Sequence, residues 1–458
     1  MSPPSDHPSK QRLLEYLLVK DTPEDAALVR EHLEQHCLRC LRELHVLIPE
    51  SHPPEVVKAF APEASEEEKS EAFRWIAYHA YRVSSVIRVE EALAPDLFGQ
   101  LLKLAPEERR KALRETTTFR FLALAEHLVE RSREKVFEDP AQAIELADLA
   151  VEASESLKPE IYPRIMILEA QALAWAALGN ARRVRSDLIG AERAFGTALG
   201  RLKRSGGKEP CNRGEVLSLL GSLRIDQTRF EEARKILEEA VAIFRNGREP
   251  RQEAKTLIQL GKAACDAGAP EEAVPYLQSA RELLDEQDAR LRMMAGHTLA
   301  MALLDAGRLE EAEALVESLA PEYEAQAGEF WTVQRRKWLA ARLAMARGAV
   351  AEAEALFREI RDGFLECEIP YDYALATLEH AGLLLGEGRV AEVRALAEEM
   401  VPLFASRQIH GHALAALALF QQAAAAQEAT STLVRDLIVY LRRARNNPQL
   451  VYPGESAR

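Results

Sequence analysis

The chain has 458 residues, and its 73 acidic side chains outnumber 59 Lys and Arg, which gives a formal net charge of −14. This balance disfavours direct binding of nucleic acid, which depends on Lys and Arg that neutralise phosphates. Hydrophobic residues make up 47% of the chain and aromatic residues only 6%. Ala, Leu, Glu and Arg predominate, as is typical of helices, so we predict an all-α fold.

Neither a signal peptide nor a membrane span is predicted. The first 20 residues lack a continuous apolar core. The most apolar later stretch, residues 413–420, is much shorter than the roughly 20 residues that cross a membrane. Cys211, Cys265 and Cys367 stand alone, as is typical of reduced thiols. We therefore expect a soluble cytoplasmic protein.

Residues 1–48 have the pattern of a small helical module. Apolar residues cluster between positions 13 and 18 and predict a first helix. Thr22 as the N-cap, Pro23 at the first helical position and two acidic residues after it predict the start of a second helix. Val29 and Leu33 continue this helix at helical spacing.

A candidate zinc site follows in this module. Two of the five cysteines of the chain, Cys37 and Cys40, form a CxxC pair. Together with His7 and His32 they make a set of four nitrogen and sulfur ligands, which suits tetrahedral Zn²⁺. His36, next to Cys37, is the alternative to His32. Loss of the metal would leave a dithiol that can oxidise.

This pattern resembles the zinc-binding anti-sigma domain of bacteria. The resemblance rests on His7-Pro8, the apolar first helix, the acidic turn, Val-x-x-His-Leu at residues 29–33, the CxxC pair and an amphipathic stretch at 41–48. The chain departs from the family at one point, because four residues rather than three separate His32 from Cys37. The resemblance implies zinc held by His7, His32, Cys37 and Cys40, and a sigma factor as partner.

Residues 49–112 are predicted to be a helical connector. Ser51-His52-Pro53-Pro54 interrupts the chain, and Ser65 with Glu68 forms a capping-box pattern at the start of an aromatic-rich helix. Two roles are open for this helix. It packs on the surface of a sigma factor, or it caps the open end of the array that follows.

Residues 113–446 repeat with a period of about 40. A turn followed by a helix start recurs five times, and its last residue advances by 40, 39, 41 and 40 positions. These last residues are Ala233, Ala273, Ala312, Ala353 and Val393. Two degenerate units precede them, at Ala143 and Val184, with an insertion expected near residues 205–210. A period held this closely predicts an α-solenoid of stacked helical hairpins.

The units resemble tetratricopeptide-type repeats, lengthened from about 34 residues to about 40. The resemblance implies recognition of proteins or peptides on a concave face. A last helix near residues 440–445 is expected to cap the array, and residues 447–458 form a tail.

No catalytic motif is present, because the chain lacks a glycine-rich phosphate loop, an HExxH sequence and a nucleophile elbow. We therefore expect a protein that is not an enzyme. Our main hypothesis is a cytoplasmic regulatory protein. Its zinc-stapled module would bind a sigma factor or similar regulator, and its array would bind a protein or peptide. The alternative is a repeat scaffold or peptide sensor whose zinc module is only structural.

Overall fold

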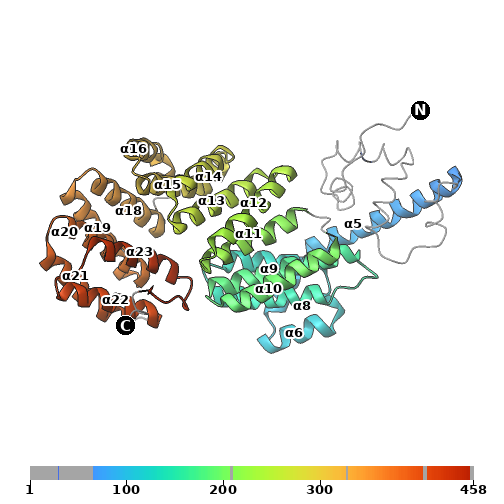
Figure 1. Cartoon of the computed structure of the whole chain (residues 1–458). Helices are drawn as coiled ribbons and strands as arrows, with labels where there is room; N and C mark the ends of the chain where they lie inside the picture. The colour runs from blue at the N-terminus through green and yellow to red at the C-terminus, as the bar shows by residue number, and fades with distance from the viewer. Residues whose placement is uncertain (1–28, 30–64, 207–209, 326–327, 406–409, 454–458) are drawn as a thin grey trace. The chain divides into compact units, whose positions relative to one another are not determined.

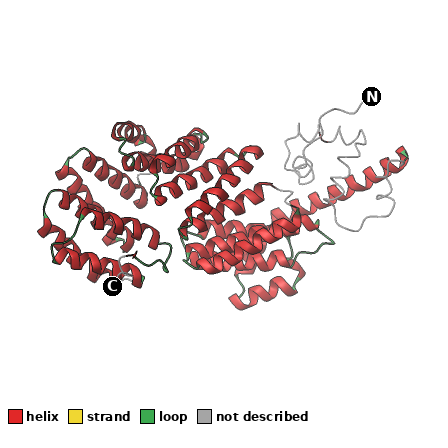
Figure 2. Ribbon diagram, in the orientation of Figure 1, coloured by secondary structure: helices red, strands yellow, loops and turns green. Residues whose placement is uncertain are grey.

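The computed structural model describes Val29 and residues 65–206, 210–325, 328–405 and 410–453 (Figure 1). Within these ranges every regular element is a helix (Figure 2), so the all-α prediction is confirmed. The chain divides into two compact units, Met1–Leu219 (unit 1) and Leu220–Arg458 (unit 2).

Unit 1 holds a long first helix followed by two helical hairpins. Helices α7 and α8 form the first hairpin and α9 and α10 the second, and α8 also packs on α9. The helices are α5 (Glu66–Leu102), α6 (Pro106–Glu115), α7 (Leu122–Lys135), α8 (Pro140–Glu155), α9 (Arg164–Val184), α10 (Leu188–Ser205) and the first half of α11 (Pro210–Asp226).

The predicted capping box starts α5. The Ser65 hydroxyl accepts a hydrogen bond from the Glu68 backbone N–H (3.2 Å), and the Glu68 carboxylate accepts one from the Ser65 N–H (2.7 Å). The second half of α5 packs on α7.

A buried carboxylate fixes α5 to the first hairpin. Glu90, only 3% exposed, accepts a hydrogen bond from the Ala123 N–H at the start of α7 (3.5 Å) and contacts the Tyr162 hydroxyl. That hydroxyl in turn accepts from the Leu122 N–H (3.3 Å). Burial raises the pKa of Glu90, although its hydrogen bond with Tyr162 opposes this shift. The carboxyl thus joins three segments of unit 1.

Unit 2 continues the array with hairpins in the predicted register. Its helices, after the second half of α11, are α12 (Phe230–Gly247), α13 (Pro250–Ala267), α14 (Pro270–Glu282), α15 (Ala289–Asp305), α16 (Leu309–Ser318), α17 (Ala320–Glu324), α18 (Phe330–Ala346), α19 (Val350–Glu366), α20 (Pro370–Gly386), α21 (Val390–Ala405), α22 (Gly411–Ala425) and α23 (Ser431–Ala444). This succession confirms the predicted solenoid.

Glycines end the first helix of several hairpins, as predicted. Gly268, Gly307, Gly348 and Gly388 all have positive φ, between 70° and 87°. A residue with a Cβ is strained in this left-handed conformation, whereas glycine enters it freely. At Gly307, for example, the chain leaves α15 and starts α16 only two residues later.

Small residues in the first helix of a hairpin admit large ones from the second. A Cβ added at Gly221 would lie 2.4 Å from a methyl group of Leu237, and one at Gly261 would lie 2.5 Å from Cγ of Leu277. In both pairs the large residue follows the small one by 16 positions. Ala341 and Phe357, both fully buried, keep the same spacing. The two helices can therefore approach closely.

We expect Gly261→Ala to lower the free energy of unfolding by about 1–2 kcal/mol. Alanine normally stabilises a helix interior relative to glycine by about 0.5–1 kcal/mol, but the new methyl group would collide with buried Leu277. The matched control is Gly200→Ala in α10, where nothing lies within 4 Å of the added Cβ. Urea denaturation should show opposite signs for the two variants. A stabilised Gly261→Ala variant would contradict the packing account.

Candidate protein-recognition surface

The second half of α11 and helices α13, α15, α18 and α20 form one face of unit 2, which we call the inner face. Helix α13 contacts α15 although α14 lies between them in sequence, and α15 contacts α18 although α16 and α17 lie between them. Helices on the concave side of a curved array approach one another in this way. Figure 1 shows these helices following the curve of the unit, with α23 on its inner side.

Polar side chains connect neighbouring inner helices, each across one repeat. The Gln259 amide donates to the Ser222 hydroxyl (3.0 Å), which joins α13 to α11. Arg342 of α18 donates to Asp305 of α15 (2.5 Å). The Trp338 indole N–H donates to the Glu379 carboxylate (2.8 Å), which joins α18 to α20. The inner face is therefore polar and ordered rather than a plain apolar groove.

Glu379 is the centre of a buried charge cluster. Its side chain is 5% exposed and accepts from Arg442 of α23 (2.9 Å), while Nε of Arg342 lies 3.7 Å away. Burial by itself would lower the pKa of Arg342, but Glu379 and Asp305 raise it further than burial lowers it. The cluster of Glu379, Arg342, Asp305 and Arg442 thus joins four helices.

Helix α23 does not stack at the end of the array as a simple cap. It packs on α20 and α22 and also contacts α13. The Arg443 guanidinium donates to the backbone carbonyl of Asp266 (2.6 Å) and lies over the ring of Phe230, 5.1 Å from its centroid. Asn446 donates to Asp226 (2.9 Å) at the end of α11. The C-terminal helix therefore crosses the inner face.

Positively charged side chains gather beside the end of α23, with Asp372 as a nearby carboxylate. Burial lowers the pKa of Arg335, and the nearby cation Arg290 lowers it further. Arg335 forms no ion pair or hydrogen bond within the part of the chain that the structure describes. Arg445 is close enough to add to this repulsion, although it pairs with Asp372 (3.1 Å).

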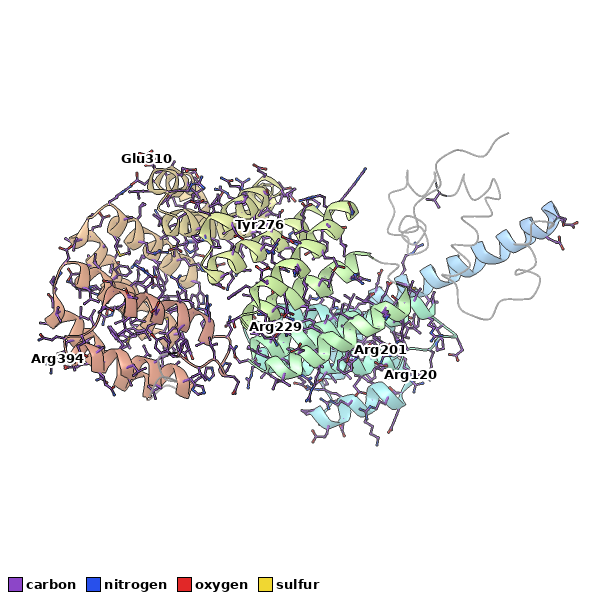
Figure 3. The ribbon with its side chains drawn as sticks, viewed as in Figure 1. Arg120, Arg201, Arg229, Tyr276, Glu310 and Arg394 are labelled. Carbon is purple, nitrogen blue, oxygen red and sulfur yellow. The ribbon has the colours of Figure 1, made fainter. Side chains whose placement is uncertain are left out.

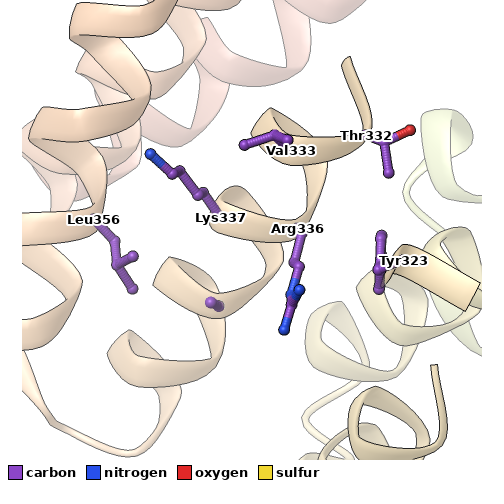
Figure 4. Close-up of a pocket in the computed structure, with 7 residues that line it drawn as sticks. Tyr323, Thr332, Val333, Arg336, Lys337 and Leu356 are labelled. Atoms are coloured by element: carbon purple, nitrogen blue, oxygen red, sulfur yellow. The ribbon is translucent and has the colours of Figure 1, made fainter. Parts of the chain in front are cut away.

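A pocket of about 330 Å³ opens beside α18, between α17 and α19 (Figure 4). Leu356 and Tyr323 stand on opposite sides of it, and Arg336 and Lys337 lie along α18. Lys337 pairs with Glu359 (2.7 Å). This volume is at the small end for ligand pockets, so it suits a side chain rather than a cofactor.

The predicted zinc ligands His7, His32, Cys37 and Cys40, and the alternative His36, lie outside the described residues. Val29, the one described residue of this module, is helical and 1% exposed, in agreement with the helix predicted there. In the remainder that the structure describes, no group of three or more His, Cys, Asp or Glu side chains has the arrangement of a metal site.

Of the single cysteines, Cys265 and Cys367 are free thiols. Cys265 is partly buried beside the charge cluster, and burial raises the pKa of its thiol to about 12. Cys367 is exposed at the end of α19. A thiol with a raised pKa is a poor nucleophile at neutral pH, so Cys265 is a packing residue.

No helix among the described residues combines the length and the apolar character needed to span a bilayer.

The fold defines the class of this protein as an all-α array of tetratricopeptide-like hairpins. A family model described as tetratricopeptide repeat matches residues 212–286, which span the hairpins from α11 to α14. The predicted resemblance to these repeats is thereby confirmed. The comparison with curated proteins gave no match, and no finding supports the resemblance of residues 1–48 to an anti-sigma domain.

Solved structures with a similar fold include aspartyl phosphate phosphatase F from Bacillus subtilis. It shares 13% identity over 89% of this chain and 97% of its own, with a TM-score of 0.50. The apo form of RapI shares 14% identity over 79% of this chain and 98% of its own, with a TM-score of 0.49. A Rap protein complexed with competence and sporulation factor shares 13% identity over 70% of this chain and 99% of its own, with a TM-score of 0.41. At these identities the likeness concerns the fold alone.

Proposed function

We propose that this protein is a scaffold that recognises a protein or peptide on the inner face of unit 2, and that it acts by binding rather than by catalysis. The observation that carries the proposal is α23 itself. A helical segment distant in sequence is held on this face by side chains of α11 and α20 and by a backbone carbonyl of α13. A surface that holds one helix through specific polar contacts has the chemistry to hold another.

Cross-linking tests the proposal. The full-length chain is used to capture partners, and the cross-linked residues are mapped by mass spectrometry. Gln259→Trp places a bulky side chain on the inner face, whereas Arg394→Trp places the same side chain on the exposed surface of α21 (Figure 3). We expect a partner cross-linked to inner helices and at least tenfold weaker capture by Gln259→Trp only. Equal capture by both variants would contradict the proposal.

For residues 1–48 we propose the zinc site described above, in which the metal stabilises the module and a sigma factor or similar regulator is its partner. The spacing of His7, His32, Cys37 and Cys40 supports the metal, and the resemblance to anti-sigma domains supports the partner. Co-purification with a co-expressed sigma factor tests the partner. Failure of the zinc-loaded chain to bind any sigma factor would leave the module a purely structural element.

We expect about one Zn²⁺ per chain in metal analysis. Cys37→Ser and Cys40→Ser should each remove it, since a thiolate ligand is lost. His32→Ala should weaken zinc binding strongly, whereas the matched variant His36→Ala should leave zinc binding nearly unchanged. His7→Ala should be intermediate, because its ligand comes from a Pro-flanked segment that must be ordered. The reverse order for His32 and His36 would make His36 the ligand.

A further inference from the structure

The contacts of α23 divide into an apolar part and a polar part. Its buried face contributes Leu437, Tyr440 and Leu441 to the same hydrophobic core as α20. The polar part lies in its last turn and just beyond, where Arg442, Arg443 and Asn446 reach three different inner helices. The apolar part alone would place the helix on α20. The polar part is what extends it across the inner face.

These polar contacts use groups that the inner helices offer to any suitable partner. Arg443 binds a carbonyl in the last turn of α13, where the helix dipole favours a cation. Asn446 binds Asp226, the last residue of α11, which is 6% exposed. The recognised features are therefore an arginine beside a helix end and an amide beside a carboxylate. Both can be supplied by another chain.

The end of α23 is also opposed by like charge. Arg445 pairs with Asp372, yet Arg335 lies close enough to repel it. The Arg445 guanidinium is 43% exposed, so solvent screens this pair. The last turn of α23 thus contacts α20 through the pair of Arg442 with buried Glu379, and it contacts α13 and α11 through hydrogen bonds of Arg443 and Asn446.

We propose that α23 is an internal occupant of the inner face, and that the partner of this face is a segment of the same chemistry. That segment is an amphipathic helix with an apolar stripe and arginines in its last turn, and it replaces α23 when it binds. This proposal rests on the proposed function and names the class of partner.

Hydrogen exchange in the full-length chain tests whether α23 is releasable. We expect the amides of residues 431–444 to exchange at least tenfold faster than those of α20, because α23 opens locally. Arg443→Ala should speed exchange in α23 a further tenfold and leave α15 unchanged. The matched control Arg435→Ala, at an exposed position of the same helix, should change nothing.

A peptide of residues 429–447, labelled with a fluorophore, tests the chemistry of the partner. It should bind the full-length Arg443→Ala/Asn446→Ala variant at least tenfold more tightly than the unaltered chain, because the internal copy competes less well. A control peptide with Glu at positions 442, 443 and 445 should not bind.

The proposal is overturned if α23 exchanges as slowly as α20 in every variant, or if the two peptides bind alike. Either result would make α23 a permanent part of the core. Cross-links between an external partner and the inner helices would then still support the proposed function. If α23 is releasable but no partner is cross-linked to the inner helices, the proposed recognition function is rejected and the proposal for α23 is not.

Discussion

Replacing Glu379 by Ala is expected to lower the free energy of unfolding by about 3–5 kcal/mol. The substitution removes the acceptor for the Trp338 indole and for Arg442, and it takes away one of the two carboxylates beside buried Arg342. A buried cation that loses part of its counter-charge is costly, because the interior solvates it poorly. The loss should appear as a lower urea midpoint.

Glu359→Ala is the control for this substitution. Glu359 also pairs with a side chain of α18, at 2.7 Å, but its own side chain is 56% exposed. Removal of an exposed pair should cost less than about 1 kcal/mol. If the two variants lose similar stability, the cluster around Glu379 does not hold the inner helices together. Glu379→Gln should lie between them, since it keeps an acceptor but loses the charge.

Lowering the pH from 6.5 to 5 is expected to destabilise unit 2 by about 3 kcal/mol through two histidines, buried His380 and partly buried His297. Burial, together with nearby arginines, lowers the pKa of His380 to about 4 and that of His297 to about 3. In the unfolded chain each would titrate near 6.5. The unfolded state therefore binds more protons in this range, and stability falls as the pH falls.

His380→Leu separates the two contributions. Both ring nitrogens of His380 lack a hydrogen-bond partner within the described residues. The imidazole ring stacks on the ring of Phe357, with 6.0 Å between the two ring centroids. Leucine should remove about half of the pH dependence and add about 1 kcal/mol at pH 7, because an unsatisfied buried polar group is lost. Denaturation curves at pH 7, 6 and 5 provide the measurement. An unchanged slope would show that His380 does not titrate as described.

The repeat and its turns could be predicted from local sequence. A 40-residue period, glycine at helix ends and alanine at helix starts are properties of neighbouring residues, and Ala273, Ala312 and Ala353 are indeed fully buried. Part of the candidate surface could also be predicted from the sequence. Glu379 and His380 interrupt an otherwise apolar stretch of α20, which is an unusual place for titratable side chains.

The course of α23 could not be predicted in the same way. Periodicity specifies which hairpins are neighbours, whereas Arg443 and Asp266 lie 177 residues apart, and Asn446 and Asp226 lie 220 apart. Such contacts depend on the overall curvature of the stacked hairpins, and this curvature cannot be predicted from a single sequence. The short helix α17 was likewise not predicted, because Leu319 and Ala320 continue a helical pattern across the break.

The constant spacing between small inner residues and large outer ones determines where the chain can change length. One residue inserted within α14 ahead of Leu277 would rotate Leu277 by about 100° about the helix axis and carry it away from Gly261. A connection between hairpins carries no such constraint. From α11 to α21 the turns within hairpins all have two or three residues, whereas the connections between hairpins vary from two residues (α12 to α13) to six (α14 to α15). Insertions and fused segments should therefore be tolerated between hairpins and rejected within them.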